Sequence, residues 1–283
     1  MTRGTILREF KDTVGFITGG ASGIGLAAAE ALGKRGMKLM LADIEADTLA
    51  RAVEGLRSKG ITAEGLPLDV ADSAAYESVT RQTLEHFGKV NFLFNNAGVG
   101  SFAMAGATPI ADWQWVVNVN LLGVAHGIEY FLPSMQALNE PCHIVNTASM
   151  AGHVGVAGMG PYNATKFAVV GYSESLRDQL AETHIKVSVL CPAFVKTRIA
   201  DSRRNHPNGS TDQHLDPVER DVAELIAETG METSQLMDIF MAGIEQDRFY
   251  LFSHADFWPV LEERLERIRQ DYAAVLAPTE SIR

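Results

Sequence analysis

The stretch Thr18-Gly19-Gly20-Ala21-Ser22-Gly23-Ile24-Gly25 decides how the first part of this chain folds. An aliphatic run at 13–18 precedes it, and a helical pattern at 23–35 follows it. Glycines suit such a junction because the backbone turns sharply and lets an anion approach the helix N-terminus. A glycine cluster alone would fit an ordinary tight turn equally well. Its position after a first strand favours a dinucleotide-binding loop, with contacts expected from Gly19, Ala21, Ser22, Gly23, Ile24 and Gly25.

Outward from this loop, β-branched and aliphatic runs alternate with helix-period stretches. The pattern predicts strands at 13–18, 38–42, 61–68, 91–94, 143–147 and 186–190, and helices at 23–35, 44–59, 73–87, 112–137 and 160–183. Such alternation is typical of right-handed crossovers and a parallel sheet covered on both faces. We therefore expect an α/β protein with a doubly wound parallel sheet, the Rossmann fold.

The pattern changes after Cys191. A polar loop is expected at 198–216, helices at 217–228 and 234–246, a last strand at 248–253 and an extra C-terminal helix at 257–274. We interpret the whole chain, 1–283, as one domain. Residues 10–197 would form the cofactor and catalytic core, 198–246 a helical substrate lid, and 247–283 the last strand and C-terminal helix. The apolar stripe of that helix would serve core packing or an oligomer contact.

Asp43 follows the second predicted strand, where a carboxylate can accept hydrogen bonds from the adenosine ribose hydroxyls. The 2′-phosphate of NADP would be repelled there by roughly 3 kcal/mol per unit charge at ~5 Å and an effective dielectric of about 20. An ordinary helix N-cap is the alternative role of Asp43. The sequence thus favours NAD, with NADP possible because Lys34, Arg35 and Arg51 could fold back.

Composition narrows the class of protein. The 283 residues carry a net charge of −11 and only two cysteines, Cys142 and Cys191. A nucleic-acid surface or a disulfide framework is not expected from this balance. No apolar run reaches the ~18 residues of a membrane span, and residues 1–10 lack the apolar core of a signal peptide. We expect a cytoplasmic protein without a metal site, because no His has a partner at metal-ligand spacing.

Tyr162 and Lys166 lie near the start of the predicted helix at 160–183, one turn apart on one face. Such a pair is weak evidence alone, since many helices carry one at the surface. Ser149 lies just after the fifth predicted strand, at the sheet edge where open α/β proteins place ligands. Asn120 falls within the preceding long helix.

These motifs together resemble those of the short-chain dehydrogenase/reductase family. The matching residues, in chain order, are Thr18-Gly-x-x-x-Gly-x-Gly25, Asp69-Val70, Asn95-Asn96-Ala97-Gly98, Asn120-Leu-Leu-Gly123, Ser149, Tyr162-x-x-x-Lys166 and Pro192-Ala-Phe-Val-Lys-Thr197. Two departures are Ala193 where the family has glycine, and the absence of its Asp-Gly-Gly ending. In the family, the Asp-Gly-Gly ending usually builds the tetramer contacts, so its absence affects the expectation of a tetramer more than that of a dimer.

The resemblance implies roles for particular residues. Tyr162 would be the acid/base, Lys166 would lower its pKa and hold the nicotinamide ribose, Ser149 would hold the substrate oxygen and Asn120 would anchor a water relay. The remaining cofactor contacts implied are Asp69, Val70, Asn96, Ala97, Gly98, Pro192, Val195 and Thr197. The resemblance also implies a homodimer or homotetramer.

For Tyr162 to act as a base near neutral pH, its pKa must be lowered. A free tyrosine titrates near ~10, so a base at neutral pH needs a shift of about three units, or roughly 4 kcal/mol. One ammonium at about 4 Å supplies roughly that much at an effective dielectric near 20.

The predicted lid supplies the substrate hypothesis. Its adaptable apolar residues are Leu225, Met231, Leu236, Met237, Phe240 and Met241. They favour a bulky, largely hydrophobic secondary alcohol or its ketone, unless they only pack the lid onto the body. Two other functions stay open: a nucleotide-binding sensor or scaffold on this fold, and a dehydratase or enoyl reductase of the same family.

Overall fold

A computed structural model describes residues 7–208 and 217–276. Tertiary contacts divide the chain into two compact units, Met1–Ser253 and His254–Arg283, and the first contains the sheet. Its strands are β1 Val14–Thr18, β2 Lys38–Asp43, β3 Ala63–Pro67, β4 Phe92–Asn95, β5 Cys142–Thr147, β6 Ile185–Cys191 and β7 Tyr250–Phe252. Every pairing between them is parallel, in the order β3-β2-β1-β4-β5-β6-β7. The doubly wound parallel sheet is confirmed.

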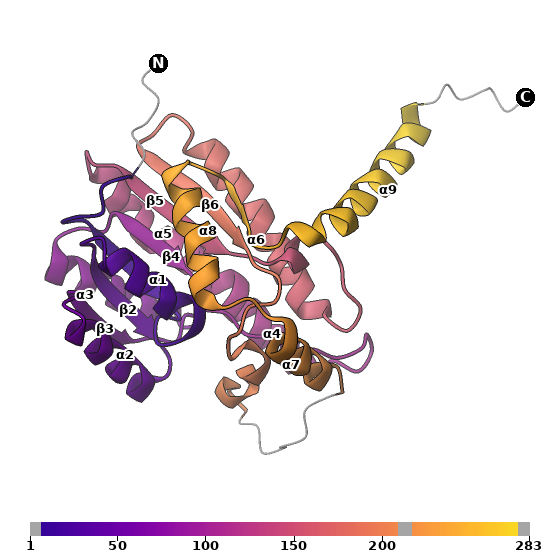
Figure 1. The fold of residues 1–283 in the computed structure, drawn as a ribbon, viewed down its shortest axis with the longest axis horizontal. Helices are drawn as coiled ribbons and strands as arrows, with labels where there is room; N and C mark the ends of the chain where they lie inside the picture. Colours follow the sequence, from indigo (N-terminus) through magenta and orange to yellow (C-terminus); the bar gives the residue numbers. More distant parts are fainter. Residues whose placement is uncertain (1–6, 209–216, 277–283) are drawn as a thin grey trace, which may run out of the picture. The chain divides into compact units, whose positions relative to one another are not determined.

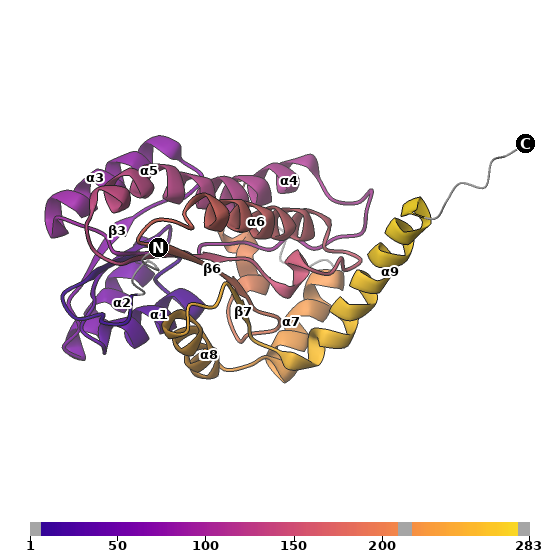
Figure 2. The same ribbon diagram turned by 90° about the horizontal axis from the view of Figure 1, so that it is seen from above.

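The helices of this unit cover both faces of the sheet (Figure 1, Figure 2). They are α1 Gly23–Gly33, α2 Ala46–Ser58, α3 Ser73–Phe87, α4 Ile110–Val117, α5 Gly123–Ala137, α6 Gly160–Gln179, α7 Pro217–Thr229 and α8 Thr233–Glu245. Helices α3, α5 and α6 lie on one face, whereas α1, α2 and α8 lie on the other (Figure 2). The second unit contains the short turn η4 Ala255–Phe257 and helix α9 Trp258–Leu276.

Two apolar cores result, one on each face. Phe16, Phe131 and Val169 belong to the core under α3, α5 and α6. Leu32, Phe94 and Phe240 belong to the core under α1, α2 and α8. Because parallel strands are buried on both faces, β1 and β5 are buried along their whole length.

The helix predicted at 112–137 is interrupted in the structure. Between α4 and α5 lies a π-helical turn, η1, at Asn118–Leu122. Such turns insert one extra residue and are frequent at functional sites. The side chain of Asn120, in this turn, bonds the backbone of Val99 on a neighbouring loop, a tertiary contact that helix periodicity does not reveal.

The segment predicted as a loop at 198–216 also differs. Residues Ile199–Asn205 form the 3-10 turns η3, while 209–216 lie outside the described residues. The hydroxyl of Ser202 donates to the carbonyl of Ile199 and accepts the N–H of Gly100. Bonds to a distant loop thus hold turns that local sequence does not favour.

The predicted lid reached residue 246, but its last part belongs to the core. Leu236, Met237, Phe240 and Met241 on α8 are buried against residues of the sheet and of α1, such as Leu32. Leu225 is exposed. Among the described residues of the predicted lid, those that line the functional cavity lie within 198–208 and at Ile226, so most of the side chains expected to contact substrate serve packing instead.

Candidate active site

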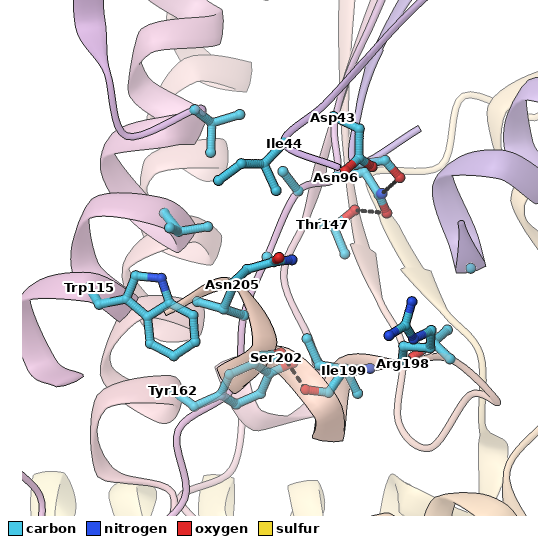
Figure 3. Close-up of a pocket in the computed structure, with 18 of the residues that line it drawn as sticks. Asp43, Ile44, Asn96, Trp115, Thr147, Tyr162, Arg198, Ile199, Ser202 and Asn205 are labelled. Atoms are coloured by element: carbon cyan, nitrogen blue, oxygen red, sulfur yellow. Dashed lines mark hydrogen bonds between the residues drawn. The ribbon is translucent and has the colours of Figure 1, made fainter. Parts of the chain in front are cut away.

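A cavity of about 450 Å³ opens at the carboxyl ends of the neighbouring strands β1 and β4, where the chain leaves β1 for β2 on one side and β4 for β5 on the other. Such a switch point is the usual ligand site of open α/β sheets. Asp43 lies at one end of the cavity and Tyr162 at the other (Figure 3). The predicted residues that line it are Gly19, Ser22, Gly23, Ile24, Asp43, Asp69, Val70, Asn96, Ala97, Gly98, Ser149, Tyr162, Lys166, Pro192, Val195 and Thr197.

Three predicted residues support the cavity from behind rather than line it. Ala21 is buried, and its N–H donates to Asp43 Oδ2 at 3.0 Å. Gly25 packs under the turn, where a Cβ would lie 2.1 Å from the carbonyl oxygen of Gly19. Asn120 is fully buried; its Oδ1 accepts the N–H of Val99 at 2.8 Å and its Nδ2 donates to the carbonyl of Val99 at 2.9 Å.

The glycine-rich turn fits a pyrophosphate. Gly19 and Gly23 have φ angles of +62° and +54°, which side chains rarely adopt. Together with the close approach of Gly25, they leave a concave backbone surface before α1, whose first N–H groups lack helical acceptors. This cradle is what a dinucleotide requires, and the sequence motif predicted it.

Thr18 is a structural residue of the site that the motif contained without an assigned role. Its Oγ1 accepts the N–H groups of Asn96 and Ala97 at 2.9 and 3.0 Å. The amide of Asn96 donates to the carbonyls of Thr18 and Gly19 at 3.1 and 3.3 Å. The loop after β4 is thereby bound to the loop after β1, which fixes the floor of the cavity.

Asp43 is held in place by two backbone donors. Besides the bond from Ala21, its Oδ1 accepts the N–H of Glu45 at 3.0 Å. The carboxylate thus lies at the cavity end beside the glycine-rich turn. It can still accept hydrogen bonds from a ligand, because each carboxylate oxygen has two lone pairs.

At the other end, α6 carries Tyr162 and Lys166 into the cavity. Lys166 Nζ donates to the carbonyl of Thr147 at 2.8 Å and lies 5.5 Å from the centre of the Tyr162 ring. Ser149 Oγ donates to the carbonyl of Pro192 at 3.1 Å and also interacts with the Tyr162 hydroxyl. The structure therefore brings Ser149, Tyr162 and Lys166 together.

Burial is the largest influence on the pKa values of both Tyr162 and Lys166. It raises the pKa of Tyr162, against a lowering effect of Ser149. It lowers the pKa of Lys166 to about 8. The expectation that Lys166 lowers the pKa of Tyr162 is not met in this structure, where desolvation of the buried phenol is the largest effect and raises its pKa.

Sequence reasoning placed residues 198–208 in the predicted lid but named none of them as site residues, although this segment crosses the cavity. Arg198, Ile199, Ser202, Arg204, Asn205 and His206 line it. Arg204 and Asn205 bind Glu45, with Nε to Oε1 at 2.7 Å and Nδ2 to Oε1 at 3.1 Å. No local signal identified these contacts, since Glu45 and Arg204 are 159 residues apart.

Neighbouring Arg203 binds a buried acidic pair. It lies 2.7 Å from Asp112 and 2.8 Å from Glu219, whose side chains are 5% and 2% exposed. Ser101 also donates to Asp112, at 2.7 Å. The network joins η3 to α4 and α7, so it positions the turn that carries Ser202 and Arg204 over the cavity.

Several histidines have packing roles in this structure. His143 is fully buried, pairs with Ser188 at 2.9 Å and has its pKa lowered to about 3 by burial.

Among the described residues, no three potential ligands gather as a metal site. In the same part of the chain, no helix is both long and apolar enough to cross a membrane.

The fold and this site define a Rossmann-type oxidoreductase that uses a nicotinamide dinucleotide. Residues 13–208 match the family model described as short chain dehydrogenase. The chain belongs to the short-chain dehydrogenase/reductase family.

Its relatives carry dehydrogenase names. A protein named C alpha-dehydrogenase from Sphingobium sp. is 36% identical over 278 residues, covering 97% of this chain and 90% of that protein. A CLA biosynthesis dehydrogenase/reductase from Lactiplantibacillus plantarum is 31% identical, covering 94% and 96%. A solved short chain dehydrogenase/reductase from Burkholderia phymatum in complex with NAD is 38% identical with a TM-score of 0.89, covering 94% and 97%.

Proposed function

We propose that this protein is an NAD-dependent dehydrogenase that interconverts a bulky, largely hydrophobic secondary alcohol and its ketone. The observation that carries the proposal is one cavity containing Asp43 at one end and Ser149, Tyr162 and Lys166 at the other. A ligand long enough to reach from Asp43 to Tyr162 would bring its reactive end to an acid/base. The cradle of Gly19, Gly23 and Gly25 fits such a dinucleotide.

In the proposed reaction, the Tyr162 hydroxyl exchanges a proton with the substrate oxygen. Ser149 Oγ holds that oxygen by a hydrogen bond, which orients the reacting carbon. Bound nicotinamide supplies the hydride acceptor or donor at its C4 atom. Lys166, which donates to the carbonyl of Thr147, would hold the nicotinamide ribose and stabilise the ionised form of Tyr162. Asn120, held by Val99 and within 3.3 Å of Thr165 Oγ1, would anchor a water relay to Lys166.

The pKa directions separate the roles of the two side chains. Burial raises the pKa of Tyr162, so the phenol stays protonated and can donate to a ketone oxygen, whereas Lys166, with a pKa of about 8, gains and loses its proton just above neutral pH. General acid–base catalysis is most efficient when the group titrates near the working pH.

The preference for NAD rests on the surroundings of Asp43. The cations that could have offset a 2′-phosphate are engaged elsewhere. Lys34 pairs with Glu30, Arg35 with Glu245, and Arg51 donates to Thr48. Arg198 and Arg204 reach this end of the cavity but pair with Glu45 and Asp201.

The remaining cofactor contacts are part of the same proposal. Asp69 and Val70 would meet the adenine, Asn96 the adenosine side, and Val195 and Thr197 the nicotinamide carboxamide and phosphate. Each of these residues lines the cavity. A homodimer or homotetramer is proposed as the assembly.

An apolar cluster beside Tyr162 supports a hydrophobic substrate. Phe102, Val222 and Ile226 are buried together, and Tyr162, Phe194 and Met159 pack against them. The Phe102 and Tyr162 rings meet edge to face at 5.7 Å. Val222 and Ile226 come from α7, so this helix supplies apolar surface next to the proposed acid/base. The dehydrogenase name of the Sphingobium relative agrees with the proposed reaction type.

The test follows the absorbance of reduced nicotinamide with a panel of aryl and cyclic secondary alcohols, using NAD⁺ and NADP⁺ in parallel. We expect turnover with NAD⁺ and a loss of ~10²–10⁴-fold in kcat on Tyr162→Phe, with NADH binding retained. Turnover that survives Tyr162→Phe would exclude the mechanism. Turnover with NADP⁺ alone would contradict the role of Asp43, and NAD binding without turnover of any alcohol would favour a sensor.

A further inference from the structure

Helix α9 carries a continuous apolar stripe that the proposed reaction does not use. Its apolar residues alternate at spacings of three and four: Trp258, Leu261, Leu265, Ile268, Tyr272 and Val275. This spacing corresponds to the a and d positions of a heptad repeat, which in coiled coils face a partner helix. In an isolated amphipathic helix these side chains would all lie on one side.

Five of the six stripe residues are exposed. Trp258 is 54% exposed, Leu265 46%, Ile268 48%, Tyr272 66% and Val275 79%, whereas Leu261 is buried. Contiguous exposed apolar residues rimmed by charges mark an interaction surface. The polar side mixes Glu262, Glu263, Glu266 and Asp271 with Arg264, Arg267 and Arg269. A helix for an anionic membrane surface would instead have a predominantly basic polar face.

The charges beside the stripe select one partner and one direction. With Trp258 at position a, Glu262 and Arg269 occupy e positions, and Arg264 and Asp271 occupy g positions. In an antiparallel pair, e faces e and g faces g. Glu262 then meets the partner subunit's Arg269, and Arg264 meets the partner subunit's Asp271, each twice by two-fold symmetry.

The apolar layers agree with the same register. Leu265 lies opposite the partner subunit's Ile268. Leu261 is already buried in its own chain, so the surface offered to the partner consists of the five exposed residues. The outermost layer joins Trp258 to the partner subunit's Val275. A parallel pair would instead set Arg264 against the partner subunit's Arg269, since g faces e in that arrangement.

We propose that α9 is a self-association helix that pairs antiparallel with α9 of a second copy of this chain. The surface is the stripe from Trp258 to Val275 with its flanking e and g charges. Arg269 already forms a bidentate ion pair with Glu266 of its own helix, at 2.7 Å for both contacts, and the partner subunit's Glu262 would complete a three-membered network. The proposal is independent of the reaction assigned to the cavity.

The first experiment measures self-association of the full chain by analytical ultracentrifugation over a range of concentrations. Glu262→Arg places like charges against the partner subunit's Arg269 and should raise the dissociation constant of the α9 contact at least ~10-fold. Asp271→Arg tests the other pair and should do the same. Glu263→Arg is the matched control, because the same charge change falls at an f position that faces away from the partner. An unchanged dissociation constant in both Glu262→Arg and Asp271→Arg would overturn the proposal.

A second experiment tests direction. Chains carrying Leu265→Cys are mixed with chains carrying Ile268→Cys and oxidised mildly, while the native Cys142 and Cys191 are buried. An antiparallel pair yields a disulfide between the two different variants. Disulfides formed only within each variant alone would indicate a parallel pair, and no cross-link in any mixture would exclude pairing through α9. NADH binding by each variant shows that the cavity unit is folded.

Discussion

Arg203 and Arg204 are consecutive in the chain, yet their guanidinium groups bind carboxylates on different sides of the site. Arg203 pairs with Asp112 on α4 and Glu219 on α7, and Arg204 pairs with Glu45 beside Asp43. The 3-10 turns η3, which carry both residues, therefore connect the end of the cavity near Asp43 to helices α4 and α7. Because Arg204 and Asn205 are both bound to Glu45, we expect that moving this segment away from the cavity requires breaking the Glu45 contacts.

Loosening this contact should speed cofactor release. Glu45→Gln removes the charge that holds Arg204 and Arg198, while leaving an acceptor for Asn205. Partly buried ion pairs of this kind contribute about 1 kcal/mol, so we expect the NADH dissociation rate to rise roughly 3–10-fold. Stopped-flow fluorescence of bound NADH measures it.

The control for this variant is Asp47→Asn, which makes the same charge change in the first turn of α2. Raising the salt concentration should accelerate release from wild type more than from Glu45→Gln, because salt screens the ion pair. Equal rates in wild type and Glu45→Gln would show that the contacts of Glu45 with Arg198 and Arg204 do not limit release.

Asp43 should set the choice between NAD⁺ and NADP⁺. Asp43→Asn keeps one acceptor oxygen, for the N–H of either Ala21 or Glu45, and loses both the charge and the second acceptor. Hydrogen bonds to charged groups contribute about 1.5–3 kcal/mol, so kcat/KM for NAD⁺ should fall roughly 10–100-fold. The value for NADP⁺ should rise, since repulsion of the 2′-phosphate disappears. Steady-state kinetics with both cofactors give the ratio, and an unchanged ratio would remove Asp43 from the specificity argument.

Gly25 should be indispensable for the cradle. In Gly25→Ala, the added Cβ would lie 2.1 Å from the Gly19 carbonyl oxygen and 2.7 Å from Asn96 Nδ2. The turn must move, so we expect NADH binding to be lost and unfolding free energy to fall by about 1–3 kcal/mol. Gly55→Ala, in the middle of α2 with no atom within 4 Å of the new methyl, should raise stability by about 0.5–1 kcal/mol. Denaturation curves and NADH titration of both variants check these results, and retained NADH binding by Gly25→Ala would contradict the cradle.

Lys166 should make stability depend on pH. Its pKa is about 8 in the folded chain against an ordinary value of 10.5. Between these values the unfolded chain holds a proton that the folded chain has released, so folding becomes more favourable as pH rises. Compared with Lys166→Met, wild type should gain about 2–3 kcal/mol of unfolding free energy between pH 7 and pH 10. Below pH 7 the difference should stay constant, because both states are then protonated.

Urea unfolding of the two proteins at several pH values measures this difference. Tyr162 is present in both proteins, so its own titration largely cancels in the comparison. A difference that does not change with pH would mean that Lys166 is less desolvated than its burial indicates.

The amino-acid sequence determined the elements that local chemistry specifies. The helix at Ser73–Phe87 was predicted at its true bounds, because Asp72 accepts the N–H of Ala75 at the start and Gly88 takes a left-handed conformation at the end. The glycine turn and the strand-helix alternation likewise predicted the sheet and its ligand edge. The order and spacing of the motifs from Thr18 to Thr197 defined the family.

Tertiary structure decided what depends on residues far apart in the chain. Only folding showed that Arg204 reaches Glu45, that Arg203 joins Asp112 to Glu219, and that a π-helical turn carries Asn120. It also moved Leu236 and Phe240 from an expected lid into the core, and it raised rather than lowered the pKa of Tyr162. Helix periodicity shows that a face is apolar, but not what covers it. Desolvation and ion pairing depend on neighbours in space, which only the folded chain brings together.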